Sequence, residues 1–229
     1  MNLEKFFRKK IIVEYEDSIL TEKDAQEMFA TIPLNFPKYF PLIPRTQVDP
    51  FLNKVIPSRK TIKTCAGFIN LYKRSILVKS PFDIYLEFGD NEIVLEHVGQ
   101  ISNRSFAVVH PNSNLLDYVG TKKYKYLVKI LLPVALDSEI SLFMSESSYH
   151  FNKFNVMPGI INSNYKRVLT FFIPIEKDTK DLYIKKGDPL FLLTPLCENK
   201  IKINYKILEH LKPNLTFSTL KKYLMDKLI

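Results

Sequence analysis

The stretch that decides the fold of this chain runs Ile84-Tyr85-Leu86-Glu87-Phe88-Gly89-Asp90-Asn91-Glu92-Ile93-Val94-Leu95-Glu96-His97-Val98. On both sides of Gly89-Asp90-Asn91 the residues alternate between two faces, which is the period of a β-strand with one buried face. Two such segments joined by a short Gly-Asp-Asn turn are typical of an antiparallel hairpin. The sequence therefore predicts a β-hairpin at this position.

Other extended segments follow one another along the chain without helices between them. We expect strands at residues 106–110, 124–132, 168–175, 190–194 and 201–207, separated by short polar turns. About ten short strands in succession are typical of a sandwich or barrel. The predicted fold class is therefore all-β, or mainly β.

Helical signals are confined to two places near the ends of the chain. Thr21 is placed to cap a helix over residues 22–30, with Asp24 at the third helical position. Ser218 is placed to cap a second helix over residues 219–228, where leucines recur every four residues beside lysines. We expect a short N-terminal helix and a C-terminal helix beside the β structure.

Prolines interrupt the region after the first helix too often for a helix or a central strand, at positions 33, 37, 41, 44, 50 and 57. The aromatic residues between them favour an irregular arm that packs on a surface over a flexible linker. We expect three parts: residues 1–60 with the first helix and this arm packed on the domain, residues 61–210 as the β domain, and residues 211–229 as a Lys-rich helix. An arm that reaches a neighbouring subunit is the alternative.

The positive charge of the chain is concentrated at its two ends. The formal charge is +9 over 229 residues, of which residues 1–10 contribute +3 and residues 200–229 contribute +5. A protein that follows a nucleic-acid backbone would carry its charge across the body of the domain. We therefore expect contact with acidic partners, including weak contact with nucleic acid through the basic termini. A solvated helix face is the alternative for the Lys-rich tail.

The composition also limits the compartment and the cofactor classes. No stretch approaches the roughly 20 apolar residues of a membrane span, and we expect no membrane contact and a place in the host cytoplasm or in a virion. Cys65 and Cys197 are the two cysteines, and two distant thiols make neither a disulfide framework nor a four-ligand metal site. We expect reduced thiols, no metal and no cofactor.

Common catalytic templates fail on this sequence. The six glycines form no phosphate loop, and the four histidines have no metal-binding spacing with one another or with an acid. A Gly-x-Ser-x-Gly nucleophile turn is also missing from the sequence. We therefore expect no catalytic residues.

Two segments carry a resemblance to a known family. The first reads Gly159-Ile160-Ile161-Asn162-Ser163-Asn164-Tyr165-Lys166-Arg167 and leads into a strand, and the second reads Ile184-Lys185-Lys186-Gly187-Asp188-Pro189-Leu190. In order and spacing they resemble segments of the trimeric dUTPase and dCTP deaminase superfamily. The resemblance implies a β-clip, a strongly bent double-layered β fold that commonly assembles as trimers. Gly187 stands where a turn requires a positive backbone φ.

The departures from that family affect its catalytic positions. Asn162 stands where those enzymes carry the aspartate that activates water, and an amide cannot accept the proton. Asn164 replaces the second aspartate, whereas Tyr165 matches the residue that packs beneath the deoxyribose. The resemblance therefore implies a shared framework without the catalytic step. We expect Asn162, Tyr165 and Arg167 to form a ligand-binding site or a subunit contact, while turn chemistry explains Asn162 and Asn164 equally well.

A looser similarity connects the chain with uncharacterised proteins of tailed phages. It rests on Lys63-Thr64-Cys65-Ala66-Gly67-Phe68, on Ser80-Pro81-Phe82-Asp83, and on the two segments above. This similarity implies a noncatalytic phage-type protein with an assembly or interaction role, including that of a virion component. The implied partners are further copies of the chain or other phage proteins. The alternative is a diverged nucleotide-binding enzyme or regulator of the dUTPase and dCTP deaminase superfamily.

Overall fold

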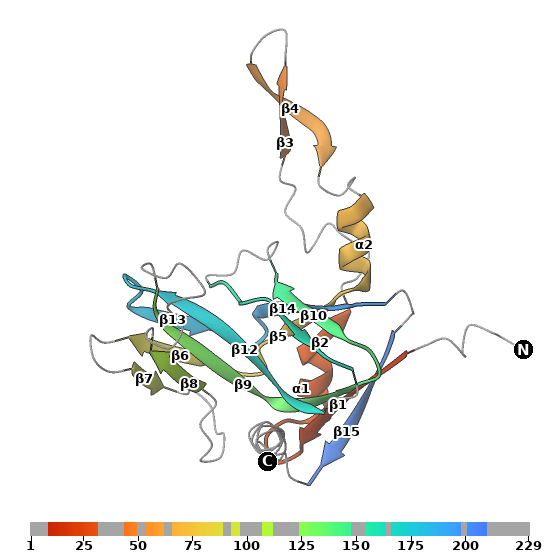
Figure 1. The fold of residues 1–229 in the computed structure, drawn as a ribbon, viewed down its shortest axis with the longest axis vertical. Coiled ribbons are helices and arrows are strands. Elements are labelled where there is room, and N and C mark those ends of the chain that lie inside the picture. The colour runs from red at the N-terminus through yellow and green to blue at the C-terminus, as the bar shows by residue number, and fades with distance from the viewer. Residues whose placement is uncertain are drawn as a thin grey trace, which may run out of the picture.

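The structure is a computed structural model that describes residues 9–31, 44–49, 54–61, 66–88, 93–96, 107–111, 124–147, 154–163, 166–197 and 201–209. This part of the chain contains fifteen strands and two short helices (Figure 1). The strands form two five-stranded sheets, one three-stranded sheet and one two-stranded hairpin. The predicted mainly β class is confirmed.

The first sheet joins the beginning and the end of the described chain. Its strands are β1 (Lys9–Glu16), β8 (Ala107–Pro111), β9 (Tyr124–Ser138), β12 (Arg167–Glu176) and β15 (Ile201–Leu208). The order is β12-β9-β1-β15, and β8 also pairs with β9. The β1–β15 pair is parallel, whereas the other neighbours are antiparallel. Parallel neighbours need a long connection, and here most of the described chain lies in the sequence between β1 and β15.

The second sheet covers the inner face of the first. Its strands are β2 (Phe29–Thr31), β5 (Ile76–Lys79), β10 (Leu142–Glu146), β11 (Gly159–Ile161) and β14 (Pro189–Pro195), in the order β11-β10-β14-β5-β2. The rings of Phe171 in β12 and Phe191 in β14 are both fully buried, with centroids 5.1 Å apart. This contact joins the two sheets across a common core.

The third sheet contains the hairpin that the sequence predicts. It consists of β6 (Ile84–Phe88), β7 (Ile93–Glu96) and β13 (Asp181–Ile184), in the order β13-β6-β7. Residues along β6 alternate in burial, with Leu86 completely covered. The ring of Phe88 stacks on Tyr126 of β9 with centroids 6.4 Å apart. The third sheet therefore packs onto the first.

Most predicted strands are present, and several others are added. Strands β8, β12, β14 and β15 lie within one or two residues of the predicted bounds, whereas β9 continues to Ser138, beyond the predicted end at 132. Strand β5 was not predicted, because Ile76, Leu77 and Val78 are all buried and such a strand shows no alternation. In β1 apolar and charged residue types alternate from Val13 to Glu16, although all four residues are buried.

The first helix forms at its predicted cap. Helix α1 (Glu22–Met28) begins after Thr21, whose Oγ1 accepts a hydrogen bond from the Asp24 N–H at 3.2 Å. The Asp24 side chain in turn accepts the Thr21 N–H, which completes a capping box. The helix ends before the predicted residue 30 because Phe29 begins β2. The predicted helix at 219–228 lies outside the described residues.

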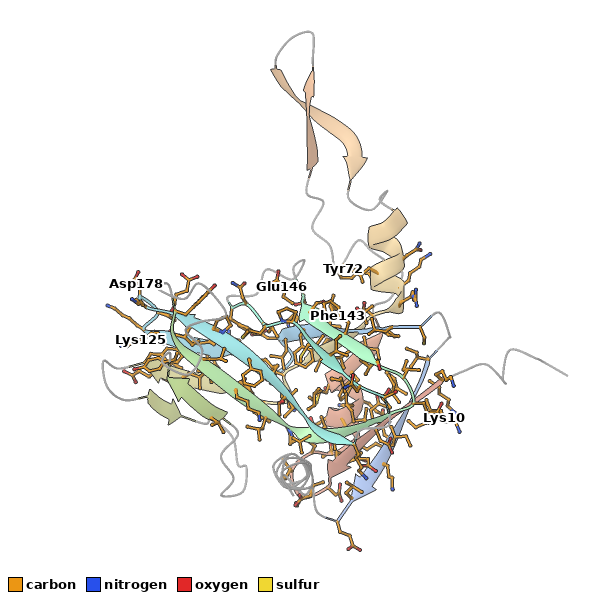
Figure 2. The ribbon with its side chains drawn as sticks, viewed as in Figure 1. Lys10, Tyr72, Lys125, Phe143, Glu146 and Asp178 are labelled. Atoms are coloured by element: carbon orange, nitrogen blue, oxygen red, sulfur yellow. The ribbon has the colours of Figure 1, made fainter. Side chains whose placement is uncertain are left out.

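Helix α2 (Ala66–Arg74) corrects the expectation of continuous strands from residue 61 onward. The apolar residues at 68, 69 and 72 recur at helical spacing, so this period was present in the sequence and was overlooked. Among the described side chains of α2, Tyr72 is fully buried. Figure 2 places Tyr72 at the end of α2 that meets the sheets. The Arg74 guanidinium donates a hydrogen bond to the backbone carbonyl of Cys197 there. In the described part of the chain, neither helix has the length and apolar character needed to cross a membrane.

The proline-rich arm contains a regular hairpin, which corrects the prediction of an irregular loop there. Strands β3 (Pro44–Asp49) and β4 (Lys54–Thr61) pair antiparallel. Each strand of an isolated ribbon keeps a free edge, and proline is tolerated at such an edge because no partner needs its missing N–H. Figure 1 shows this hairpin beyond α2, standing away from the three larger sheets. The rest of the predicted arm lies outside the described residues.

Candidate functional site

The three residues that the sequence selects lie on the connection from β11 to β12. Asn162 follows β11 directly and is exposed to solvent. Arg167 is the first residue of β12, where its backbone pairs with Leu136 of β9. Tyr165 lies outside the described residues, and the side chain of Arg167 is also outside them. The structure therefore places the backbone of Asn162 and Arg167 on one connection without describing a pocket shared by the three side chains.

A buried carboxylate of β1 holds this connection. Lys166, next to Arg167, forms an ion pair with Glu14, whose side chain is only 2% exposed. Lys206 of β15 lies directly opposite Glu14 in the parallel register, and its Nζ is 3.5 Å from Glu14 Oε1. Two ammonium groups therefore approach one carboxylate, from the beginning of β12 and from the last described strand.

The position of Glu14 follows from strand alternation. Val13 and Tyr15 point into the core, so Glu14 points to the opposite face of the first sheet. Lysine stems cover apolar surface while their charged ends remain near water, which lets the lysines flank this carboxylate. The cluster ties β12 and β15 to β1. Sequence reasoning missed it, although the alternation in residues 9–16 would have placed Glu14 on the outer face.

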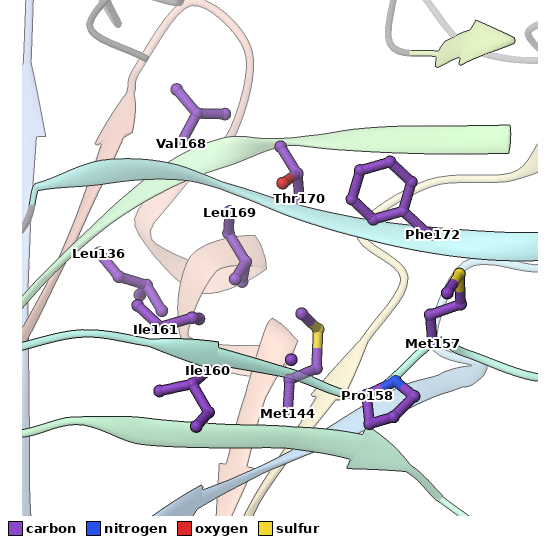
Figure 3. A pocket seen from close by; sticks show the side chains of 11 residues that line it. Leu136, Met144, Met157, Pro158, Ile160, Ile161, Val168, Leu169, Thr170 and Phe172 are labelled. Atoms are coloured by element: carbon purple, nitrogen blue, oxygen red, sulfur yellow. The ribbon is translucent and has the colours of Figure 1, made fainter. Parts of the chain in front are cut away.

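A cavity of about 210 Å³ lies beside the same connection, between β11 and β12 (Figure 3). Figure 3 shows Leu136 and Ile161 at one end of it, and Met157 and Phe172 at the other. The lining residues are Leu136, Met144, Met157, Pro158, Gly159, Ile160, Ile161, Val168, Leu169, Thr170 and Phe172. The Thr170 hydroxyl is the one side-chain polar group in this set, which contains no charged side chain and does not include Asn162.

The second segment of the family resemblance forms the predicted turn between β13 and β14. Gly187 has a φ of 87°, so the predicted positive backbone angle is confirmed. Its N–H donates to the carbonyl of Ser80 at 2.7 Å, and the Asp188 carboxylate accepts the Lys185 N–H at 2.9 Å. These bonds fix a tight turn at the end of the third sheet.

Two carboxylates contact Lys186 in that turn, and a tyrosine contacts one of them. Lys186 Nζ lies 2.6 Å from Asp24 Oδ1 of α1, and the Lys186 backbone N–H donates to Asp83 Oδ1 at 2.6 Å. The hydrogen bond with Lys186 lowers the pKa of Asp24 below its ordinary 3.8 and raises the pKa of Lys186. Tyr183 donates to Asp83 at 3.1 Å, and this bond raises the pKa of Tyr183. The turn therefore connects α1 with the third sheet. Its contacts with Asp24 and Asp83 were not predicted from the sequence.

Within the described residues, no three His, Cys, Asp or Glu side chains are grouped closely enough to hold a metal ion. Cys197 is half-buried at the end of β14, and Cys65 lies outside the described residues.

Comparison of the chain with protein-family models, curated proteins and solved structures finds no match.

Proposed function

We propose that this chain is a noncatalytic phage-type protein with an assembly or interaction role, such as a component of a virion capsid or tail. The observation that carries the proposal is the β3–β4 hairpin, which stands away from the sheets. A two-stranded hairpin alone is at best marginally stable in water. Such a ribbon is expected to gain its stability from the surface of another protein.

The composition of the hairpin fits a protein partner. Residues 44–61 contain four basic residues and one acidic residue, so the ribbon carries a net positive charge. Its free strand edges offer backbone groups for strand addition, which is a common mode of peptide recognition. The partner is proposed to be another copy of the chain or another phage protein with an acidic surface, in the host cytoplasm or in the particle.

The base of the hairpin also exposes apolar surface. Leu71 of α2 is 42% exposed, and Leu196 after β14 is 56% exposed. The hydrogen bond from Arg74 to the Cys197 carbonyl joins the segments that carry these two side chains. Apolar surface next to a projecting ribbon supports an interface that extends from the hairpin onto the body.

Replacing residues 45–60 with a short Gly-Ser linker tests the proposal. We expect the full chain to form oligomers in size-exclusion chromatography with light scattering, and the shortened chain to be monomeric. Circular dichroism should show the same melting temperature for the sheets in both proteins, because β3 and β4 pair with none of the other described strands. A full chain that stays monomeric at every concentration and recovers no other phage protein as a partner, or a shortened chain that still assembles, would contradict the proposal.

The alternative function is that of a diverged nucleotide-binding enzyme or regulator of the dUTPase and dCTP deaminase superfamily, in a β-clip framework. One observation favours it, because Gly159–Ile161, within the segment that resembles that family, line a cavity. The lining lacks a charged side chain that could hold a phosphate. A deoxynucleotide at a hundred times its Kd should stabilise a binding protein by about 2.7 kcal/mol. Thermal melting with each deoxynucleotide tests this, and unchanged melting temperatures would remove the alternative.

A further inference from the structure

The cavity lies between two consecutive segments of the chain, which are joined by one hydrogen bond and then separate. Residues 157–161 and 167–172 follow each other along the chain, and the Met157 N–H donates to the Phe172 carbonyl at 3.0 Å. Beyond that bond, β11 pairs with β10 of the second sheet while β12 pairs with β9 of the first. The two segments therefore diverge, and the cavity occupies the space between them.

An irregularity in the pairing of β9 with β12 lies at the same place. The register shifts between Val168, which pairs with Ala135, and Thr170, which pairs with Leu131, so the extra residues are in β9. A bulge bends the strand that carries it and redirects side chains, and bulges are common beside functional sites. Because Val168 and Thr170 both line the cavity, the bulge in β9 lies next to it.

The lining determines which ligand chemistry the cavity accepts. Ten of its eleven residues present apolar side chains or, at Gly159, backbone alone. Pro158 and Ile160 are exposed, so the cavity is open to solvent and an apolar ligand would displace water from an apolar surface. A charged ligand would find no side chain of opposite charge in this lining.

Thr170 supplies the polar contact. Its hydroxyl belongs to the lining, and its backbone lies two residues before Phe172. Because backbone groups at alternate residues point to the same edge of a strand, Thr170 directs its N–H and C=O to the edge where Phe172 accepts from Met157. Thr170 can therefore form a hydrogen bond with one hydroxyl or amide group of a ligand.

We propose that this cavity is a binding site for a small, uncharged and largely apolar molecule, of about the size of one substituted aromatic ring, whose single polar group contacts Thr170. Met144 and Met157 have flexible, polarizable side chains that adapt to such a ligand. The proposal concerns a different surface from the β3–β4 hairpin and does not depend on the proposed function.

Toluene, benzyl alcohol and benzoate test the ligand class, with binding followed by NMR of methionine methyl groups in the full chain. We expect toluene and benzyl alcohol to shift the Met144 and Met157 methyl signals and to raise the melting temperature. Met28 is the internal control because it is buried in α1, away from the lining. Benzoate should shift none of the three signals. Unchanged Met144 and Met157 signals with both neutral probes, or equal effects of benzoate, would overturn the proposal.

Two substitutions test the location. A Cβ at Gly159 would meet only Met144 Cε, at the ordinary contact distance of 3.6 Å, so Gly159→Leu should fill the cavity and abolish both probe effects. Gly67→Ala is the matched control, because its Cβ meets nothing within 4 Å and it lies in α2. Benzyl alcohol has a hydroxyl that can bond to Thr170, so it should bind more tightly than toluene. Thr170→Val keeps the side-chain shape and should remove this difference. Probe effects that persist in a folded Gly159→Leu protein would contradict the assignment.

Discussion

At the scale of single residues, two glycines with the same free space differ in backbone conformation. Gly187 has a φ of 87°, whereas Gly67 lies within α2, and a Cβ at either position would meet no atom within 4 Å. Steric crowding is therefore absent at both sites. Only backbone strain and helix propensity distinguish the effects of adding a methyl group.

We expect the two alanine substitutions to change stability in opposite directions. Gly187→Ala should lower the free energy of unfolding by about 1 to 2 kcal/mol, because an L-residue is strained at positive φ. Gly67→Ala should raise it by up to about 1 kcal/mol, because alanine is the better helix former. Urea unfolding of both variants measures this, and a stabilising Gly187→Ala would show that the turn relaxes to another conformation.

Individual site residues were predictable only where the reason was local. The turn sequence identified Gly187, since a positive φ depends on the residue and its neighbours. It also drew attention to Asn162, which proves to be exposed and outside the cavity lining. Glu14 was missed, because its two lysine partners are separated from it by most of the chain.

At the scale of elements, the contact between α1 and the β13–β14 turn depends on one ion pair. Asp24 also belongs to the capping box of α1, so its carboxylate joins the helix start to Lys186. The pKa of Asp24 is lowered mainly by its hydrogen bond with Lys186. A carboxyl whose pKa is lower in the folded state stabilises the protein above its unfolded pKa, and this contribution is lost as the pH falls.

We therefore expect the free energy of unfolding to decrease as the pH falls below about 4, because Asp24 takes up a proton there in the unfolded chain and only at lower pH in the folded protein. Lys186→Met should weaken this dependence and, at pH 6, cost about 0.5 kcal/mol, because both groups are partly exposed. Lys185→Met is the neighbouring control and should leave the slope unchanged. Urea titrations between pH 6 and pH 2 measure the slopes, and equal slopes for wild type and Lys186→Met would refute the role of the pair.

Local sequence patterns predicted some of the helices and strands and missed others. The β6–β7 hairpin and α1 follow from alternation and from a cap, both of which are local. Helix α2 was missed although its apolar residues recur at helical spacing, and the β3–β4 hairpin was missed because of its prolines. Only the hairpin depends on context that the residue types alone do not reveal.

At the scale of the whole molecule, the three larger sheets share one core. Phe171 and Phe191 join the first two sheets, and Leu86 of the third belongs to the same buried cluster. Sheets that share a core are expected to unfold together. The β3–β4 hairpin forms a separate two-stranded sheet, which pairs with none of the other described strands.

Phe171→Ala should lower the free energy of unfolding by about 3 to 5 kcal/mol, through lost apolar burial and the cavity left behind. Phe172→Ala is the matched control on the other face of β12, where the ring is half-buried, and should cost clearly less. Denaturant titrations followed by near-UV and far-UV circular dichroism should give one coincident transition for each protein. Separate transitions, or equal losses in the two variants, would show that the sheets do not share a core.

The sequence by itself determined the mainly β class, the α1 cap, the β6–β7 hairpin and the glycine turn, because each depends on neighbouring residues. The tertiary structure alone decided that β1 pairs in parallel with β15, that Glu14 meets Lys166 and Lys206, and that a cavity forms between β11 and β12. Those features depend on which distant strands become neighbours. Such pairings are fixed by packing of the whole core, and no local pattern of residues specifies them.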